Sequence, residues 1–165
     1  MENNIKPSIT ITKEQLLQHW QGHRSLTRRT IEAFPEDKLF NHSIGGMRPF
    51  SEMVMEMIHM AAPGAQGIAT GTWEKFGEVA GSDSKKPETK QELLELWDWS
   101  TVQINQYWEQ IPEGRLQEKD VAFGAWEGQT WWHLLYFIDN EIHHRGQGYV
   151  YLRSLGIEPP HFWER

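Results

Sequence analysis

Apolar residues recur at the three- and four-residue spacing of an amphipathic α-helix in four stretches of this 165-residue chain. Each stretch closes at a proline or a glycine, residues that interrupt helices or end them. Helices with one apolar face each must bury those faces against one another, so the pattern favours a single antiparallel bundle domain over residues 1–165. The predicted helices run from about Lys13 to Phe34, from Phe50 through His59, from Lys90 to Ile111, and from about Trp131 to Leu155.

Local signals place the ends of these helices. In a capping box, a threonine and a residue three positions later each accept a backbone N–H of the other, and two such pairs mark the first and third helices. Thr130 is the predicted cap of the last helix, and Gly156 is its predicted stop. In the second helix, Pro63 leaves the carbonyl of His59 without its usual partner, which predicts a kink or a break. The two capping boxes are Thr12 with Gln15 and Thr89 with Glu92.

The segments between the helices differ in character. Residues 77–87 are rich in Gly, Ser and Lys, which predicts a loop. The longer connection over residues 113–129 is predicted to contain a short strand or a turn around Val121. Residues 158–163 are too aromatic for a free end, so we expect the tail to fold back onto the domain.

Composition narrows the classes of function. The chain has no cysteine, which excludes disulfides, thiolate metal ligands and a cysteine nucleophile. Sixteen basic residues against 23 acidic residues, with no basic run, argue against binding to a nucleic-acid backbone. No apolar run approaches the ~20 residues that span a bilayer, and the polar residues 1–12 lack the apolar core of a signal peptide. We therefore expect a cytoplasmic protein that binds neither nucleic acid nor membrane and acts on an unidentified small molecule.

Nine tryptophans are an unusual number for a chain of this length. Large aromatic side chains dominate the energetics of cores and interfaces, and each indole N–H needs a partner when it is buried. The first interpretation is a tryptophan-rich core together with a subunit interface. The alternative is a platform on which bases or sugars stack.

The fourth helix is apolar on two sides and therefore needs to be covered twice. One side should meet the bundle core, and the other should meet the long loops or a second subunit. Gly146 and Gly148 each cost about 1 kcal/mol inside a helix, which predicts a close approach by a neighbouring element. One side carries Trp131, Leu135, Ile138, Ile142 and Tyr149, and the other carries His133, Phe137, Asn140, His144, Gly148 and Tyr151.

Polar residues on the second of these sides have the spacing of metal ligands. Asn140 and His144 are four residues apart and project side by side, which is how one helix offers two ligands to one ion. Glu141, three residues before His144, is the alternative ligand, whereas His143 points about 100° away. His59 on the second helix is the natural third partner, because bundle sites form between facing helices. The competing interpretation is that these are core histidines without a metal.

A second metal arrangement rests on two Glu-x-x-His pairs, Glu56 with His59 and Glu141 with His144, as in di-iron carboxylate bundles. Such a site also needs an inward glutamate from each of the other two helices, whose glutamates lie near helix ends. His133 lies roughly 16 Å along the axis from His144 and cannot share an ion with it. This arrangement is the less favoured of the two.

The segment Asn140–Gln147 (NEIHHRGQ) resembles a segment of the DinB/YfiT-like family, and residues 151–160 (YLRSLGIEPP) are similar to the ending of that family. The position of His59 on the second helix also matches the family pattern. The resemblance implies an all-α fold, an up-down-down-up four-helix bundle. It also implies that the protein is a homodimer.

The resemblance further implies a centre in which three histidines hold nickel or zinc, one from the second helix and two from a His-x-x-x-His pair on the fourth. His59 matches the first ligand and His144 the last. Asn140 stands in the place of the remaining histidine, and an amide oxygen is a weaker donor to these metals than imidazole. We expect the metal to be bound weakly with Glu141 or water completing the site, to be replaced by another ion, or to be absent.

Two functions follow from this resemblance. The first is a metal-dependent hydrolase or thiol S-transferase, in which the ion activates a water or a thiol. Glu141, Glu56 and His143 are alternative general bases, and the sequence assigns no catalytic residue. The second is a non-catalytic, dimeric stress-response or small-molecule-binding bundle with a degenerate metal site.

Overall fold

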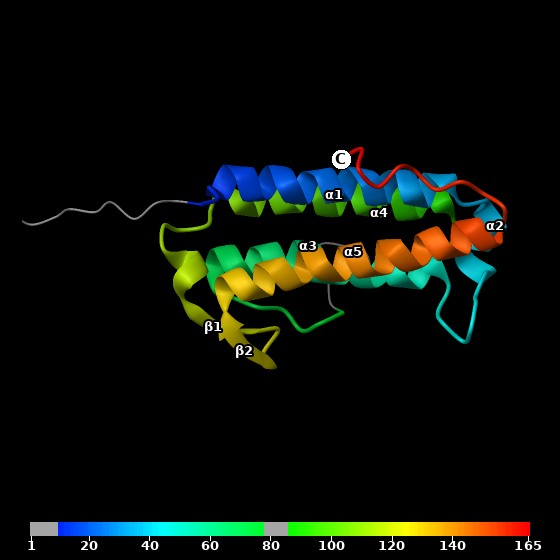
Figure 1. Cartoon of the computed structure of the whole chain (residues 1–165). Coiled ribbons are helices and arrows are strands. Elements are labelled where there is room, and N and C mark those ends of the chain that lie inside the picture. The colour runs from blue at the N-terminus through cyan, green and yellow to red at the C-terminus, as the bar shows by residue number, and fades with distance from the viewer. Residues whose placement is uncertain (1–9, 78–85) are drawn as a thin grey trace, which may run out of the picture.

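The computed structural model describes residues 10–77 and 86–165. Within these ranges the chain is mostly helical, with five α-helices, one short 3-10 helix and a two-stranded antiparallel sheet (Figure 1). The predicted loop over residues 77–87 falls mostly outside the described residues. The elements are α1 (Lys13–Ala33), α2 (Glu36–Asn41), α3 (Phe50–Thr70), α4 (Lys90–Trp108), η1 (Arg115–Gln117), β1 (Lys119–Ala122), β2 (Trp126–Gln129) and α5 (Thr130–Ser154).

The four long helices lie in two layers, α1 with α4 and α3 with α5 (Figure 1). Contacts of α1 with α5 and of α3 with α4 join the layers. The predicted packing of four long helices is confirmed, since each one buries a face against two others. The all-α class needs a correction, because β1 and β2 form a small sheet and α2 is an additional short helix. None of the helices in the described ranges has the length and hydropathy that crossing a membrane requires.

Both capping boxes form as predicted. The Thr12 hydroxyl accepts the backbone N–H of Gln15 at 3.2 Å, and the Gln15 side chain accepts the N–H of Thr12 at 2.9 Å. At the start of α4, the Thr89 hydroxyl accepts the N–H of Glu92 at 3.2 Å. These bonds satisfy N–H groups that have no partner within their own helix, which fixes where α1 and α4 begin.

The last helix begins one residue earlier than predicted and stops as predicted. Thr130 is the first residue of α5 and not its cap, because its hydroxyl donates to the carbonyl of Glu118 at 3.0 Å. Gly156 follows the helix with a φ of 74°, a left-handed conformation that glycine adopts without strain. The N–H of Ile157 then turns back to the carbonyl of Leu152 at 2.9 Å, which closes the helix end.

Pro63 does not break the second long helix. α3 runs without interruption from Phe50 to Thr70 with Pro63 buried inside it, so the predicted break is wrong. Packing explains the difference. A Cβ on Gly64 would lie 2.5 Å from the ring of Phe137, so α5 presses against α3 directly after the proline. Burial of this apolar helix outweighs one lost backbone hydrogen bond, which contributes about 1 kcal/mol.

Of the nine tryptophans, three are buried, four are exposed, and Trp73 and Trp99 are half-buried. Trp20, Trp97 and Trp108 are at most 1% exposed, and the rings of Trp20 and Trp108 meet edge to face at 6.2 Å. The predicted tryptophan-rich core is therefore confirmed. Packing in the core does not account for the four exposed tryptophans, which are Trp126, Trp131, Trp132 and Trp163.

A buried set of polar side chains, here called the Glu141 cluster, joins α5 to α1. Arg24 and Glu141 are each 1% exposed, and their Nη1 and Oε2 atoms lie 3.6 Å apart. The Thr27 hydroxyl donates to Oε1 of Glu141 at 2.7 Å, and Nη2 of Arg145 donates to Nδ1 of His23 at 3.0 Å. Burial of a charge is costly unless the charge is paired, and Arg24 and Glu141 pair with each other here, while Nη1 of Arg24 makes no hydrogen bond.

The C-terminal tail runs back along α1, as predicted (Figure 1). Nη1 of Arg29 lies 3.7 Å from the carboxylate of Glu164, and the same guanidinium donates to the Glu164 carbonyl. The rings of Phe162 and Trp163 are nevertheless 63% exposed. Polar contacts therefore hold this end of the tail against α1, and burial of its aromatic rings contributes little.

The two glycines of α5 differ in their surroundings. A Cβ on Gly148 would lie 2.5 Å from the ring of Phe50, which confirms the predicted close approach. Phe50 is fully buried and its ring stacks on Phe34 at 4.8 Å, so it cannot turn aside. A Cβ on Gly146 would have no neighbour within 4 Å in the described part of this chain. The predicted close approach is therefore wrong for Gly146 within a single chain.

We predict opposite effects for alanine at these two positions. Gly148→Ala should lower the free energy of unfolding by about 1–3 kcal/mol, because it overpacks the core against Phe50. Gly146→Ala should raise it by about 0.5–1 kcal/mol, because alanine favours the helix and its methyl group meets open space. Urea denaturation of both variants beside the wild type checks the pair. Equal effects of the two substitutions would contradict the packing described here.

His23 predicts a dependence of stability on pH. Burial, and next the charge of Arg145, lower the pKa of His23 from 6.5 to about 3. In the unfolded chain His23 takes up a proton below about pH 6.5, but in the folded chain it stays neutral down to about pH 3. The free energy of unfolding therefore falls as the pH drops from about 6.5 toward 3. His23→Gln removes this contribution, and between about pH 7.5 and pH 5 it should lose about 2 kcal/mol less stability than the wild type. Urea denaturation at both pH values measures the difference, and parallel losses would refute the assignment.

Candidate ligand-binding site

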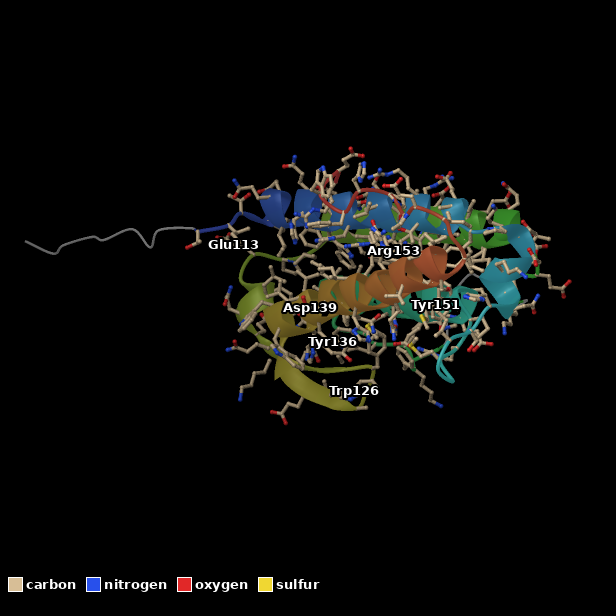
Figure 2. The ribbon with its side chains drawn as sticks, turned by 45° about the vertical axis from the view of Figure 1, so that its right-hand side comes forward. Glu113, Trp126, Tyr136, Asp139, Tyr151 and Arg153 are labelled. Carbon is tan, nitrogen blue, oxygen red and sulfur yellow. The ribbon has the colours of Figure 1, made fainter. Side chains whose placement is uncertain are left out.

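A cavity of about 390 Å³ lies between α3, α5, the hairpin of β1 and β2, and the segment that follows α3. We call it the aromatic pocket, because six of its lining residues carry aromatic rings other than histidine. Figure 2 labels two of them, Tyr136 on α5 and Trp126 on the hairpin beneath it. The lining consists of Glu56, Met60, Phe76, Ala122, Phe123, Trp126, Trp132, His133, Tyr136 and Phe137.

Three of the rings form a corner. Phe76 and Phe123 lie 86° from parallel, and each is 81° from Trp126, with ring centroids 5.6 to 6.2 Å apart. Edge-to-face contacts of this kind are favourable because the positive edge of one ring meets the negative face of the next. Phe123 also meets Phe137 of α5 at 6.0 Å, which ties the corner to the bundle.

The hairpin places this corner through a tight turn. Ala122 of β1 pairs with Trp126 of β2, so the connection between the strands is only three residues long. Phe123 has a φ of 53° and Gly124 a φ of 72°, both in the left-handed region. A left-handed φ is costly for phenylalanine, and the surrounding contacts must hold it there. The strained turn directs the Phe123 ring inward, where it is 9% exposed.

Trp132 and Tyr136 form the α5 side of the pocket. They are four residues apart, so they share one face of the helix, and their rings stack at 5.8 Å. Both remain about half exposed, at 48% and 49%. His133 lies beside them, buried, with Nε2 donating to the Asp120 carbonyl at 3.4 Å. On its α5 side the pocket therefore has a buried residue, His133, and two half-exposed rings at its entrance, Trp132 and Tyr136.

The polar end of the pocket is Glu56, the centre of what we call the Glu56 cluster. Its Oε1 accepts Nδ2 of Asn140 at 3.0 Å and Nε2 of His144 at 3.0 Å. Its Oε2 accepts Nη2 of Arg48 at 2.6 Å. Burial raises the pKa of Glu56, but the hydrogen bonds from His144, Arg48 and Asn140 outweigh burial and lower it to about 2. The carboxylate is therefore charged and held from three sides.

Both ring nitrogens of His144 are engaged. Because the Glu56 carboxylate only accepts hydrogen bonds, Nε2 carries a proton and donates it. Nδ1 lies 2.6 Å from the side-chain amide of Gln147, whose oxygen and nitrogen exchange places when the amide turns over. A metal ion bound to His144 would have to displace Glu56 or Gln147.

The structure separates the four metal ligands proposed from the sequence. His144 and Asn140 come together at Glu56, as their spacing predicts. His59 is half-buried on α3, where burial lowers its pKa, and in the described part of the chain no hydrogen bond joins it to either residue. Glu141 points to the other side of α5 and belongs to the Glu141 cluster. Glu141 therefore serves as a structural ion-pair partner.

This donor set differs from a three-histidine metal centre. Across residues 10–77 and 86–165, no three His, Asp or Glu side chains gather in a group able to hold an ion, and this also excludes the di-iron arrangement there. Arg48 places a positive charge on Glu56, where a cation would otherwise bind. Oδ1 of Asn140 is buried without a hydrogen-bond partner, so one oxygen remains for an ion. The donors fit a weak mixed site of one nitrogen and several oxygens.

Sequence reasoning missed most of the pocket. Glu56 was expected as one of three general bases and as the partner of His59 in a Glu-x-x-His pair, and neither expectation placed it beside Asn140 and His144. Trp126 and Trp132 belong to the excess of tryptophan that the composition revealed. The predicted strand or turn around Val121 is confirmed by β1 and the turn after it, but no pattern indicated that the Phe123 ring points inward.

The fold is similar to those of several proteins of known crystal structure. A DinB-like protein from Bacillus subtilis, YjoA, matches with a TM-score of 0.74 and 22% identity, over 92% of this chain and 99% of that chain. A DinB-like protein from Bacillus cereus matches with a TM-score of 0.71 and 16% identity, over 90% of this chain and 95% of that chain. At these identities the likeness shows a shared fold.

A further match is the mycothiol-dependent maleylpyruvate isomerase, with a TM-score of 0.60 and 12% identity, over 82% of this chain and 60% of that chain. No curated protein matches this chain in sequence. The sequence profile of the DinB family, in contrast, matches residues 1–165. The chain therefore belongs to the DinB family.

Proposed function

We propose that this DinB-family protein binds a small organic molecule in the aromatic pocket. The observation that carries the proposal is the position of Glu56, which lines the pocket and is also the centre of the Glu56 cluster. Ligand sites are typically concave and apolar, with a few fixed polar groups that orient the ligand. A cavity of about 390 Å³ with one held carboxylate fits that description.

The chemistry of the lining favours binding over covalent catalysis. Apart from the phenol of Tyr136, the described lining residues offer no hydroxyl, thiol or amine, and the remaining nucleophiles, Glu56 and His133, are held in hydrogen bonds. Asn140 and His144 hold the Glu56 carboxylate in place and are not themselves lining residues. Their proposed role is therefore to position Glu56, while the rings enclose the apolar part of the ligand.

A metal-dependent hydrolase or thiol S-transferase is the second candidate function. The buried and unpartnered Oδ1 of Asn140 supports it, as does the fold likeness to a mycothiol-dependent isomerase. His144, Glu56 and Asn140 would hold the ion, and His59 or water would complete the site. A bound divalent ion such as zinc or nickel acts as a Lewis acid and lowers the pKa of a bound water or thiol.

We also propose the assembly and chain course that the family resemblance implies. The colours of Figure 1 support an up-down-down-up order, with α1 and α5 running one way and α3 and α4 the other. A homodimer is supported by the outer face of α5, where Trp131, Leu135 and Ile142 are each 38% exposed.

Two neighbouring tryptophans of α5 test the binding proposal with indole as the probe. Trp132 lines the pocket and Trp131 does not, and both rings are exposed, so alanine at either position should leave the fold intact. Trp132→Ala should weaken indole binding roughly three- to tenfold, because it removes one aromatic contact. Trp131→Ala should leave the affinity unchanged. Titrations followed by NMR shifts of β2 and α5 amides measure both, and absence of indole binding to the wild type would refute the proposal.

Metal affinity is tested with untagged protein, because a histidine tag brings its own nickel. In equilibrium dialysis against zinc or nickel, the wild type should bind weakly, and His144→Ala should bind less still because it removes the strongest donor. His143 is exposed and outside the Glu56 cluster, so His143→Ala is the matched control and should bind as the wild type does. If elemental analysis finds equal metal in the wild type and His144→Ala, this candidate function is wrong.

A further inference from the structure

The aromatic pocket combines ring faces with a negative charge. Phe76, Phe123 and Trp126 form the perpendicular corner described above, and Trp132 and Tyr136 add two stacked rings from α5. The face of an aromatic ring is electron-rich and attracts a cation placed over it. Rings arranged on several sides of one cavity are therefore suited to a positively charged group.

Charge in and around the pocket points the same way. Glu56 is the charged side chain of the lining, and Arg48, which lies outside the lining, keeps the carboxylate ionised and offsets part of its negative charge. No lysine or arginine is among the lining residues that the structure describes. The whole chain carries a net charge of −7, which attracts cations and repels anions over longer distances.

The hydrogen bonds at Glu56 decide what kind of cation fits. Oε1 already accepts Asn140 and His144, and Oε2 already accepts Arg48. A primary ammonium brings three N–H donors that need acceptors, and the rest of the lining is almost entirely apolar. A quaternary ammonium has no N–H donor, so it loses nothing when it is surrounded by rings.

We propose that the aromatic pocket binds a quaternary ammonium group, with Phe76, Phe123, Trp126 and Trp132 around the cation and the Glu56 carboxylate at the end of the cavity. This inference rests on the proposed function, since it names the class of ligand for the same pocket. The cavity of about 390 Å³ exceeds the size of a trimethylammonium group alone, so the natural ligand carries an additional apolar or aromatic part.

Three small probes separate charge from shape. Choline carries a trimethylammonium group, 3,3-dimethylbutan-1-ol is its neutral isostere, and ethanolamine carries a primary ammonium in its place. We expect the wild type to bind choline about tenfold or more tighter than either of the others, because a desolvated cation–π contact and a carboxylate both favour the quaternary cation. NMR titration of β2 and α5 amides at low salt measures all three affinities.

Two variants test the residues responsible. Trp132→Leu keeps an apolar side chain but removes a ring face, so it should weaken choline binding and leave the neutral alcohol unaffected. Glu56→Gln should also weaken choline binding, whereas Glu52→Gln is its matched control one turn earlier on α3, outside the lining. Because Trp132 is exposed, its variant stays informative even if Glu56→Gln fails to fold.

The outcomes distinguish this inference from the proposed function. If indole binds in the pocket but the neutral alcohol binds as tightly as choline, the ligand class is wrong and the binding function stands. Choline binding that survives Trp132→Leu unchanged also overturns the inference, because the cation then lies elsewhere. If neither indole nor choline binds, the inference and the proposed function both fail.

Discussion

The Glu56 carboxylate is the contact on which the functional face of this molecule depends. It accepts hydrogen bonds from Asn140 and His144 of α5 and an ion pair from Arg48, which precedes α3. Burial alone would raise the pKa of this carboxyl, and the three donors reverse that effect. One group therefore does two things: it fixes α5 against α3, and it gives an otherwise apolar pocket a negative end. Without its donors the same carboxylate would be an unpaired charge in a poorly solvated place, which is costly.

Helix α5 separates two polar environments that the sequence presents as one motif. Asn140 and Glu141 are neighbours, yet successive residues of a helix point about 100° apart. Asn140 consequently faces Glu56 of α3, whereas Glu141 faces Arg24 and Thr27 in the core. The Glu141 cluster is almost fully buried and internally paired, which suits a structural role. The Glu56 cluster borders a cavity, and that difference in surroundings is why function is assigned to one cluster and stability to the other.

The limits of sequence reasoning follow from the range of each interaction. The four long helices were predictable because periodicity and capping boxes are local, and the joint orientation of Asn140 and His144 follows from their four-residue spacing. The start of α5 was missed by one residue because the Thr130 hydroxyl bonds to Glu118, a contact distant in sequence. Glu56 precedes His59 by three residues, and Glu141 precedes His144 by the same number. Spacing alone therefore could not show that His144 bonds to Glu56 of another helix and not to Glu141. A strand or turn around Val121 was predictable, but the aromatic corner was not, since the φ of 53° at Phe123 and the contact of Phe76 with the hairpin depend on residues distant in sequence.

The two candidate ligands make different demands on the same carboxylate. A divalent metal ion binds through lone pairs, so it must displace the N–H of His144 from Glu56 and lie close to the guanidinium of Arg48. A quaternary ammonium needs no lone pair, since its charge is spread over methyl groups that rest on ring faces. It can therefore approach the carboxylate through the pocket while Asn140, His144 and Arg48 keep their hydrogen bonds. Asn140, which stands where the family resemblance implies a histidine, also favours an organic cation over a metal. Its amide donates an N–H to Glu56, whereas an imidazole at that position would offer a nitrogen ligand to a metal ion. The hydrogen bonds that a metal ion would have to displace are thus the ones that an organic cation would leave in place.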